Sequence, residues 1–138
     1  MFTLSQLQAA AYRFEMANGR SLEPVERDSV IAAGLERIDP RALADQICGW
    51  LDSAPELSNE FRSTAFWALG KSYDFNLLEF FRHHLSREVK RDVAVAYQIM
   101  IALDNLSEPV WQPDRRSFSI AERELNHDAA VRYLAERL

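Results

Sequence analysis

The amino-acid sequence predicts an all-α protein made of antiparallel helical hairpins, with about seven helices in one domain over residues 1–138. Three observations support this prediction. The segment Val93–Leu103 carries Gln98 as its only strongly polar side chain, which is typical of a helix enclosed by other helices. Elsewhere, apolar side chains recur at intervals of three and four residues, the period of an amphipathic helix. The chain also holds only four glycines and five prolines, which disfavours long loops.

Capping residues and helix breakers indicate the boundaries of the predicted helices. Thr3 and Gln6 have the spacing of a capping box for the first helix. Asp39 stands before a proline, the usual order of an N-cap and a first-turn proline, at the start of the third helix. Gly70 is expected to end the fourth helix in a left-handed conformation, and Ser86 to cap the sixth. The helices are expected near residues 3–17, 24–38, 40–53, 59–70, 74–85 and 86–106, and one or two more follow a loop over 107–118.

The middle of the chain contains an imperfect internal repeat. Short connections between the helices predicted over 40–106 indicate two consecutive hairpins stacked side by side. The stripe of Leu43, Ile47 and Leu51 reappears 34 residues later as Leu77, Phe81 and Leu85. Phe61–Gly70 resembles the inner helix of a HEAT-type repeat, and Arg91–Ala94 resembles that element again. This resemblance spans about half the chain and implies a short HEAT-like array, with an irregular helical bundle as the alternative.

Composition and charge limit the classes of function. The formal net charge of −5 disfavours non-specific binding to DNA, RNA or an anionic membrane and favours a basic protein partner. Cys48 is the only cysteine, so an intramolecular disulfide is excluded, and its apolar neighbours favour a small core residue. The first residues lack the basic start and long apolar run of a secretory signal, and the apolar run over 93–103 is too short to cross a bilayer. A cytoplasmic protein without membrane contact is therefore expected.

The sequence contains no recognisable catalytic, metal or cofactor signature. His83 and His84 are adjacent, so on a helix they project about 100° apart and cannot clasp one ion, and His127 is isolated. The two histidines are interpreted as a rim pair, meaning that both lie at the edge of the fold near the C-terminal end of the fifth helix, where positive charge is favourable. No glycine-rich phosphate loop and no Gly-x-Ser-x-Gly motif occurs. We therefore expect a non-enzymatic protein that binds neither a metal nor a cofactor.

Acidic side chains form the first candidate binding surface. Asp45 and Asp52 are seven residues apart, which places both on one face of the third predicted helix, and Glu56 and Glu60 follow across the next turn. This carboxylate ridge is either a solvated helix face or a docking surface for a cationic partner. Three aromatic residues are candidate apolar anchors beside it: Trp67, Tyr73 and Trp111. Each of them either contributes to an interface or closes the core from outside.

A basic segment over residues 82–91 is the second candidate surface, and its candidate contacts are Arg87, Lys90 and Arg91. The segment is interpreted as a solvated corner, as a contact to a phosphate backbone or as a contact to an acidic protein. HEAT-like proteins include DNA glycosylases, so the resemblance implies a nucleic-acid-binding or base-modifying alternative. The short, acidic chain counts against that alternative.

The chain as a whole resembles the bacterial immunity proteins of contact-dependent growth inhibition and other polymorphic toxin systems. The features that carry this resemblance are small size, acidity, a single cysteine, predicted helices and the lack of a catalytic signature. The resemblance implies a toxin domain as the partner, with Asp45, Asp52 and Glu56 covering its cationic surface and excluding its substrate. A regulatory homodimer is the third hypothesis for the function.

Overall fold

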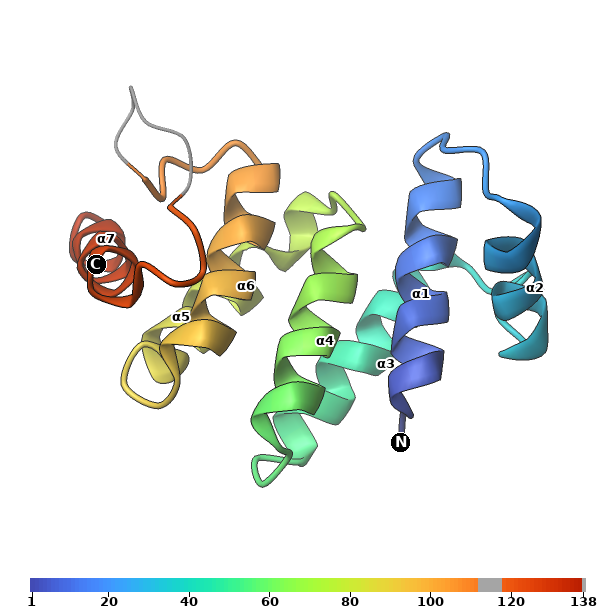
Figure 1. Cartoon of the computed structure of the whole chain (residues 1–138), viewed down its shortest axis with the longest axis horizontal. Coiled ribbons are helices and arrows are strands. Elements are labelled where there is room, and N and C mark those ends of the chain that lie inside the picture. Colours follow the sequence, from blue (N-terminus) through green and yellow to red (C-terminus); the bar gives the residue numbers. More distant parts are fainter. Residues whose placement is uncertain (112–117, 138) are drawn as a thin grey trace. The chain divides into compact units, whose positions relative to one another are not determined.

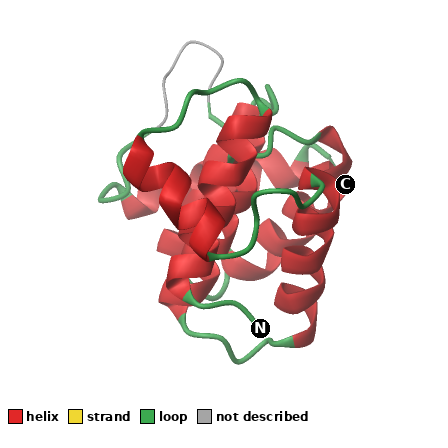
Figure 2. Cartoon of the chain, turned by 90° about the vertical axis from the view of Figure 1, so that its right-hand side faces the viewer, coloured by secondary structure: helices red, strands yellow, loops and turns green. Residues whose placement is uncertain are grey.

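The structure of the chain, a computed structural model, describes residues 1–111 and 118–137. In this part of the chain every regular element is a helix: seven α-helices and one short 3-10 helix are present, and no strand occurs (Figure 1 and Figure 2). The predicted all-α fold class is therefore confirmed. Contacts between Cα atoms divide the chain into two compact units, Met1–Tyr73 and Asp74–Leu138. The expectation of one domain over 1–138 stays a prediction.

The first unit is built around its first helix. Its elements are α1 (Leu4–Ala17), α2 (Pro24–Ala32), α3 (Pro40–Ser53) and α4 (Asn59–Gly70). Helix α1 contacts each of the other three helices, and α3 also packs against α4 (Figure 1). Fully buried apolar side chains from α1, α3 and α4 form the core: Leu7, Phe14, Leu43, Ile47, Phe66 and Leu69. Helix α2 contributes only Val30 to this core, so it is the least buried helix of the unit.

The second unit is centred on a single apolar helix. Its elements are the 3-10 helix η1 (Phe75–Leu77) and the helices α5 (Leu78–Glu88), α6 (Val93–Asn105) and α7 (Arg123–Ala135). Helix α6 packs against both α5 and α7, which also contact each other. Every residue from Val93 to Leu103 is buried or half-buried. The predicted enclosure of this segment is therefore confirmed for one side of the helix. The residues on the other side are half-buried: Val93, Ala94, Tyr97, Gln98 and Ile101.

Hydrogen bonds at the helix ends confirm several predicted boundaries. The N–H of Gln6 donates to Thr3 Oγ1 at 3.1 Å and the N–H of Thr3 donates to Gln6 Oε1 at 2.9 Å, which completes the capping box of α1. At α3, the N–H of Ala42 donates to Asp39 Oδ2 at 3.1 Å. Gly19, just past α1, has a φ of +95°. These signals are reliable because each of them acts within about one helical turn.

Two predicted helix ends in the first unit are wrong. The second helix is predicted to reach residue 38, but α2 ends at Ala32 and the chain turns at Gly34, whose φ is +73°. Glycine adopts this left-handed conformation without a steric penalty, so Gly34 ends the helix, although the apolar spacing of Ile31, Leu35 and Ile38 continues past it. Gly70 is not the left-handed stop of the fourth helix. It is the last helical residue of α4, and the backbone becomes left-handed only at Tyr73, with a φ of +50°.

The predicted sixth helix starts too early. Helix α5 continues through Ser86 to Glu88, and Ser86 Oγ donates to the carbonyl oxygen of His83 at 2.6 Å instead of capping a new helix. Asp92 is the N-cap of α6, since its Oδ1 accepts a hydrogen bond from the N–H of Val95 at 3.0 Å. Residues 89–92 therefore form the connection between α5 and α6.

The two predicted hairpins are present, one in each unit. Helix α3 packs against α4, and α5 packs against α6. The repeated apolar stripe is buried throughout, with at most 6% exposure at Leu43, Ile47, Leu51, Leu77, Phe81 and Leu85. The segments Ser58–Phe61 and Ser86–Val89, which follow the two stripes, share the pattern Ser-x-Glu-apolar. This part of the repeat fails in the structure, because Ser58 caps α4 whereas Ser86 lies inside α5. The HEAT-like resemblance stays a prediction, and residues 112–117 of the predicted loop lie outside the described residues.

Candidate functional site

The predicted carboxylate ridge is a solvent-facing surface of the first unit. Asp45 and Asp52 lie on α3, Glu56 lies in the connection to α4, and Glu60 lies in the first turn of α4. All four residues are exposed. The opposite side of α3 packs into the core through the predicted buried stripe. The predicted placement of the acidic residues outside the core is therefore confirmed.

A glycine interrupts this acidic surface. Gly49 follows Asp45 by four residues and precedes Asp52 by three, so the three residues share one face of α3. Gly49 is exposed, and a Cβ placed on it would meet no atom within 4 Å. A glycine inside a helix costs about 1 kcal/mol relative to alanine. Nothing in the surrounding packing requires this glycine, and the backbone of α3 is left open between two carboxylates.

Half-buried aromatic side chains lie beside the acidic surface. The ring centroid of Trp50 is 5.3 Å from that of Phe2 and 6.1 Å from that of Phe61. A depression of about 410 Å³ lies next to Phe2 and Trp50. The sequence places Trp50 and Phe61 on buried stripes, but both are only half-buried. Phe2 precedes the first helix, so helical periodicity gives no signal for this cluster.

The three predicted aromatic anchors have different environments. Trp67 is half-buried, with Lys71 Nζ 5.8 Å from its ring centroid. Tyr73 is 51% exposed. Trp111 is only 4% exposed, and its Nε1–H donates to Asn126 Oδ1 at 3.3 Å. Of the two interpretations given for Trp111, the core role holds: its side chain belongs to the interior of the second unit and offers no surface to a partner.

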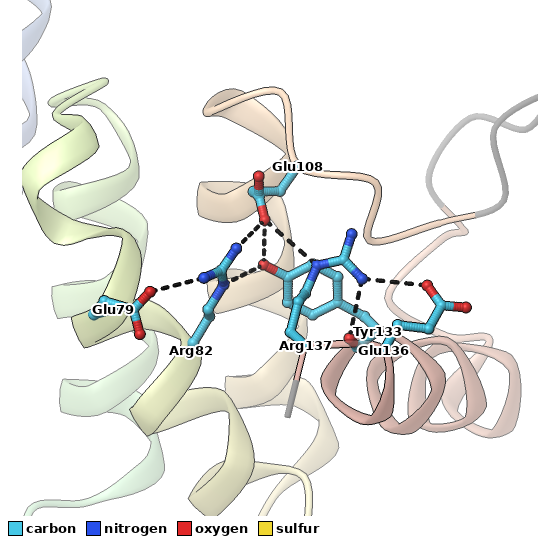
Figure 3. Close-up of polar contacts among 6 residues, drawn as sticks. All are labelled: Glu79, Arg82, Glu108, Tyr133, Glu136 and Arg137. Carbon is cyan, nitrogen blue, oxygen red and sulfur yellow. Dashed lines mark hydrogen bonds and ion pairs between the residues drawn. The ribbon is translucent and has the colours of Figure 1, made fainter.

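The second unit contains a polar cluster that the sequence does not indicate (Figure 3). Glu108 Oε1 accepts hydrogen bonds from Arg82 Nη2 at 2.7 Å and from the Tyr133 hydroxyl at 2.6 Å. Arg82 Nε also donates to the Tyr133 hydroxyl at 3.0 Å. Arg137 Nε lies 3.7 Å from the same carboxylate oxygen, and its guanidinium carbon is 4.2 Å from the Tyr133 ring centroid. The cluster joins α5, the segment after α6, and α7.

The protonation states within this cluster follow from its geometry. Burial alone would raise the pKa of Glu108, but the hydrogen bonds from Tyr133 and Arg82 and the nearby positive charges hold that pKa below its ordinary value. Burial raises the pKa of the Tyr133 hydroxyl, although its hydrogen bond with Arg82 acts in the opposite direction. The cluster therefore holds an ionised carboxylate and a neutral phenol at neutral pH, and it stabilises the packing of α7 against α5.

The predicted basic corner is also exposed. Arg87 lies in the last turn of α5, and Lys90 and Arg91 lie in the connection to α6. The two histidines beside it differ, because His83 is exposed whereas His84 is buried with its ring centroid 4.3 Å from that of Phe80. The interpretation of the histidines as a rim pair is therefore wrong for His84, which packs inside the unit.

The structure alone defines the class of this protein, by its fold. Among the residues that the structure describes, no three histidine, cysteine, aspartate or glutamate side chains are placed to hold a metal ion. In the same part of the chain, no helix combines the length and apolar character needed to cross a membrane. No family model, no curated protein and no solved structure matches the chain. It is an all-α protein with helical hairpins, and its function is inferred from its own surfaces.

Proposed function

We propose that the chain is a non-enzymatic protein-binding module whose acidic surface, Asp45, Asp52, Glu56 and Glu60, docks onto a basic surface of another protein in the cytoplasm. The observation that carries this proposal is the exposure of all four carboxylates together with the open backbone at Gly49. Exposed charges of one sign steer a partner of opposite charge and speed its association. The open backbone allows a partner to approach α3 more closely than a side chain would permit.

Aromatic side chains supply the apolar part of this proposed interface. Trp67 is half-buried and Tyr73 is exposed, and both belong to the same unit as the acidic residues. Aromatic anchors carry most of the affinity at typical protein interfaces, whereas the charges around them set orientation and association rate. The half-buried Trp50, which lies on α3 between Gly49 and Asp52 in sequence, is a further anchor in this proposal.

The partner that fits this surface best is a toxin domain with a cationic substrate site, as in the bacterial immunity proteins that the sequence resembles. Such toxins need positive charge to hold an anionic substrate, and an acidic protein laid over that charge excludes the substrate. The formal net charge of −5 supports a partner of opposite sign. No catalytic group of this chain takes part in the proposed mechanism.

The test is capture of a stoichiometric protein partner from the native host at low salt. We expect the tagged chain to retain one protein with a basic binding surface, and the double variant Asp45→Lys and Asp52→Lys to weaken that complex at least about tenfold. The matched control reverses two other exposed acids of the same unit, Asp28→Lys and Glu36→Lys. Recovery of no stoichiometric partner, or equal loss of binding in both double variants, would contradict the proposal.

The exposure of Arg87, Lys90 and Arg91 around one connection supports a second candidate function, binding to a nucleic-acid backbone. Duplex DNA at low salt is the test. A salt-sensitive complex that is lost when all three residues become alanine would favour this function over the docking of a basic protein. The absence of any mobility shift at low salt would remove it.

A further inference from the structure

A groove runs along the second unit between α5 and α7. It encloses about 580 Å³ and is formed by residues of this unit alone. Its apolar lining residues are Val89, Val131, Leu134 and Ala135. Its charged or titratable lining residues are Glu79, Arg82, His83, Lys90 and Arg137. A concave surface that combines apolar side chains with a few polar groups is typical of a binding site.

Helix α7 carries more apolar surface than its own packing uses. Its inner side is buried through Ala129, Ala130 and Tyr133. Val131 nevertheless stays 46% exposed and forms part of the groove, where Leu134 continues the apolar surface beside it. Apolar side chains that gather in a groove, rather than being scattered singly, mark a surface for another molecule.

One end of the groove carries positive charge that the described residues do not neutralise. Arg82 and Arg137 are paired with Glu108, and Arg82 also contacts Glu79. Lys90 is exposed, and within residues 1–111 and 118–137 its ammonium makes no hydrogen bond or ion pair. The exposed Arg87 lies one turn before it. A molecule bound in this groove therefore gains affinity if it places an acidic group near Lys90.

The length of the groove favours a peptide over a compact small molecule. Its α5 side runs along one helical face from Glu79 through Arg82 to Ser86, about 10 Å at the rise of an α-helix, and Val89 and Lys90 of the connection after α5 extend it. The helical part alone corresponds to about two turns of a bound helix or to about three residues of extended chain. A helix lying in such a groove places apolar residues three and four positions apart against the apolar side chains that line it.

We propose that the groove between α5 and α7 binds an amphipathic peptide segment of another protein, with apolar side chains on Val131 and Leu134 and an aspartate or glutamate paired with Lys90. This site is separate from the acidic surface of the first unit and selects the opposite charge. Its failure would therefore leave the proposed docking function of the acidic surface intact, whereas Lys90 is shared with the candidate nucleic-acid surface.

The test is a selection of random dodecapeptides displayed on phage against the immobilised full-length chain. We expect the enriched peptides to combine Asp or Glu with two apolar residues three or four positions apart. Fluorescence anisotropy of the enriched peptides then measures affinity for Val131→Glu and Lys90→Glu, each expected to weaken binding at least about tenfold. The matched controls are Leu125→Glu and Arg123→Glu, exposed residues of α7 that do not line the groove, and both should bind normally.

Several outcomes would overturn the inference. One is a phage selection that enriches no peptide or enriches basic peptides. Another is peptide binding that survives Val131→Glu and Lys90→Glu but is lost in the two control variants. The other molecule that could occupy the groove is a second copy of this chain. Sedimentation velocity over a range of protein concentrations tests for such a dimer. A dimer that Val131→Glu abolishes and Leu125→Glu preserves would assign the groove to self-association instead. Circular dichroism of each variant checks that an exposed substitution leaves the helical fold intact.

Discussion

Glu108 is the residue on which the polar contacts of the second unit converge. A single carboxylate oxygen accepts from Arg82 and Tyr133 and lies 3.7 Å from Arg137 Nε. The pKa of Glu108 in the folded protein lies below its ordinary value, so the unfolded chain takes up a proton more readily on acidification. The stabilisation by Glu108 is therefore complete at neutral pH and is lost as the pH falls below about 4.3.

We expect Glu108→Gln to lower the free energy of unfolding at pH 7 by about 2 kcal/mol, because charge-assisted hydrogen bonds become neutral ones. The difference from the parent chain should shrink as the pH falls below about 4.3, because the parent chain then also loses the charge of Glu108. Urea unfolding followed by circular dichroism across this range measures both effects.

The matched control for this variant is Glu136→Gln, which removes an acid paired with Arg137 at 3.2 Å on a side chain that is 58% exposed. Exposed ion pairs contribute little, so the change should stay below about 0.5 kcal/mol. If Glu136→Gln destabilises the protein as much as Glu108→Gln, or if the effect of Glu108→Gln does not depend on pH, the role given to Glu108 is wrong.

The sequence predicts the positions that follow from local helical periodicity, but not the contacts between residues far apart in the chain. The exposure of Asp45 and Asp52 follows from the buried stripe on the same helix, so periodicity identifies it. The contacts of Glu108 link residues 25 and 26 positions away, and no local pattern encodes such pairs. Trp111 follows the same rule. Its indole N–H donates to Asn126 of α7, and the proline-containing sequence around Trp111 does not indicate this contact.

The boundary between α5 and α6 is a choice between two residues that can both cap a helix. Ser86 and Asp92 are both residue types that favour the N-cap position, so the sequence allows both starts. The structure places the boundary at Asp92, and α5 extends far enough for Leu85 and Glu88 to be buried along its inner side. Tertiary packing therefore decides between two local signals of similar strength.

We expect Asp92→Ala to destabilise the protein by about 1 kcal/mol, because the N–H of Val95 loses its capping acceptor. Ser86→Ala should change stability by less than about 0.5 kcal/mol, since Ser86 is exposed inside α5 and only donates to a carbonyl of its own helix. Chemical denaturation of the two variants compares them directly. A larger effect of Ser86→Ala would place the helix start where the sequence alone predicts it.

At Gly49 of α3, the residue that favours stability differs from the residue that favours the proposed docking. We expect Gly49→Ala to stabilise the protein by up to about 1 kcal/mol, because alanine is the better helix former and its Cβ meets nothing within 4 Å. The same variant should weaken binding of the proposed partner, since the methyl group fills the open backbone between Asp45 and Asp52.

Gly34→Ala is the contrasting control for Gly49→Ala. A Cβ at Gly34 also meets nothing within 4 Å, but the φ of +73° strains any other residue, so this variant should lose about 1 kcal/mol. Thermal unfolding measures the stability of both variants. A destabilising Gly49→Ala would show that the helix itself needs the glycine, and that result would remove the support which Gly49 gives to the docking surface.

Across the whole molecule, apolar burial is distributed unevenly among helices of similar regularity. Helix α6 exposes no residue from Val93 to Leu103, whereas α2 buries only Val30 and leaves Val25 and Ile31 73% and 47% exposed. The fold class is predictable because the long apolar run and the helical periodicity both persist over many residues. The short α2 is predicted less well, since its pattern continues past the glycine that ends it.

This uneven burial predicts how the helices open. Helix α2 packs against α1 with Val30 as its only buried side chain, and the pair of Arg20 and Glu26 at 3.0 Å joins its first turn to the preceding loop. The Arg20 side chain is 42% exposed, and ion pairs in contact with water add little stability. We therefore expect the amides of α2 to exchange with deuterium through local opening, at a much lower free energy than those of α6, whose release requires exposure of a core. Hydrogen exchange followed by mass spectrometry resolves both segments. Equal protection of α2 and α6 would mean that the least buried helix opens only when the most buried one does, and that burial does not set local stability in this protein.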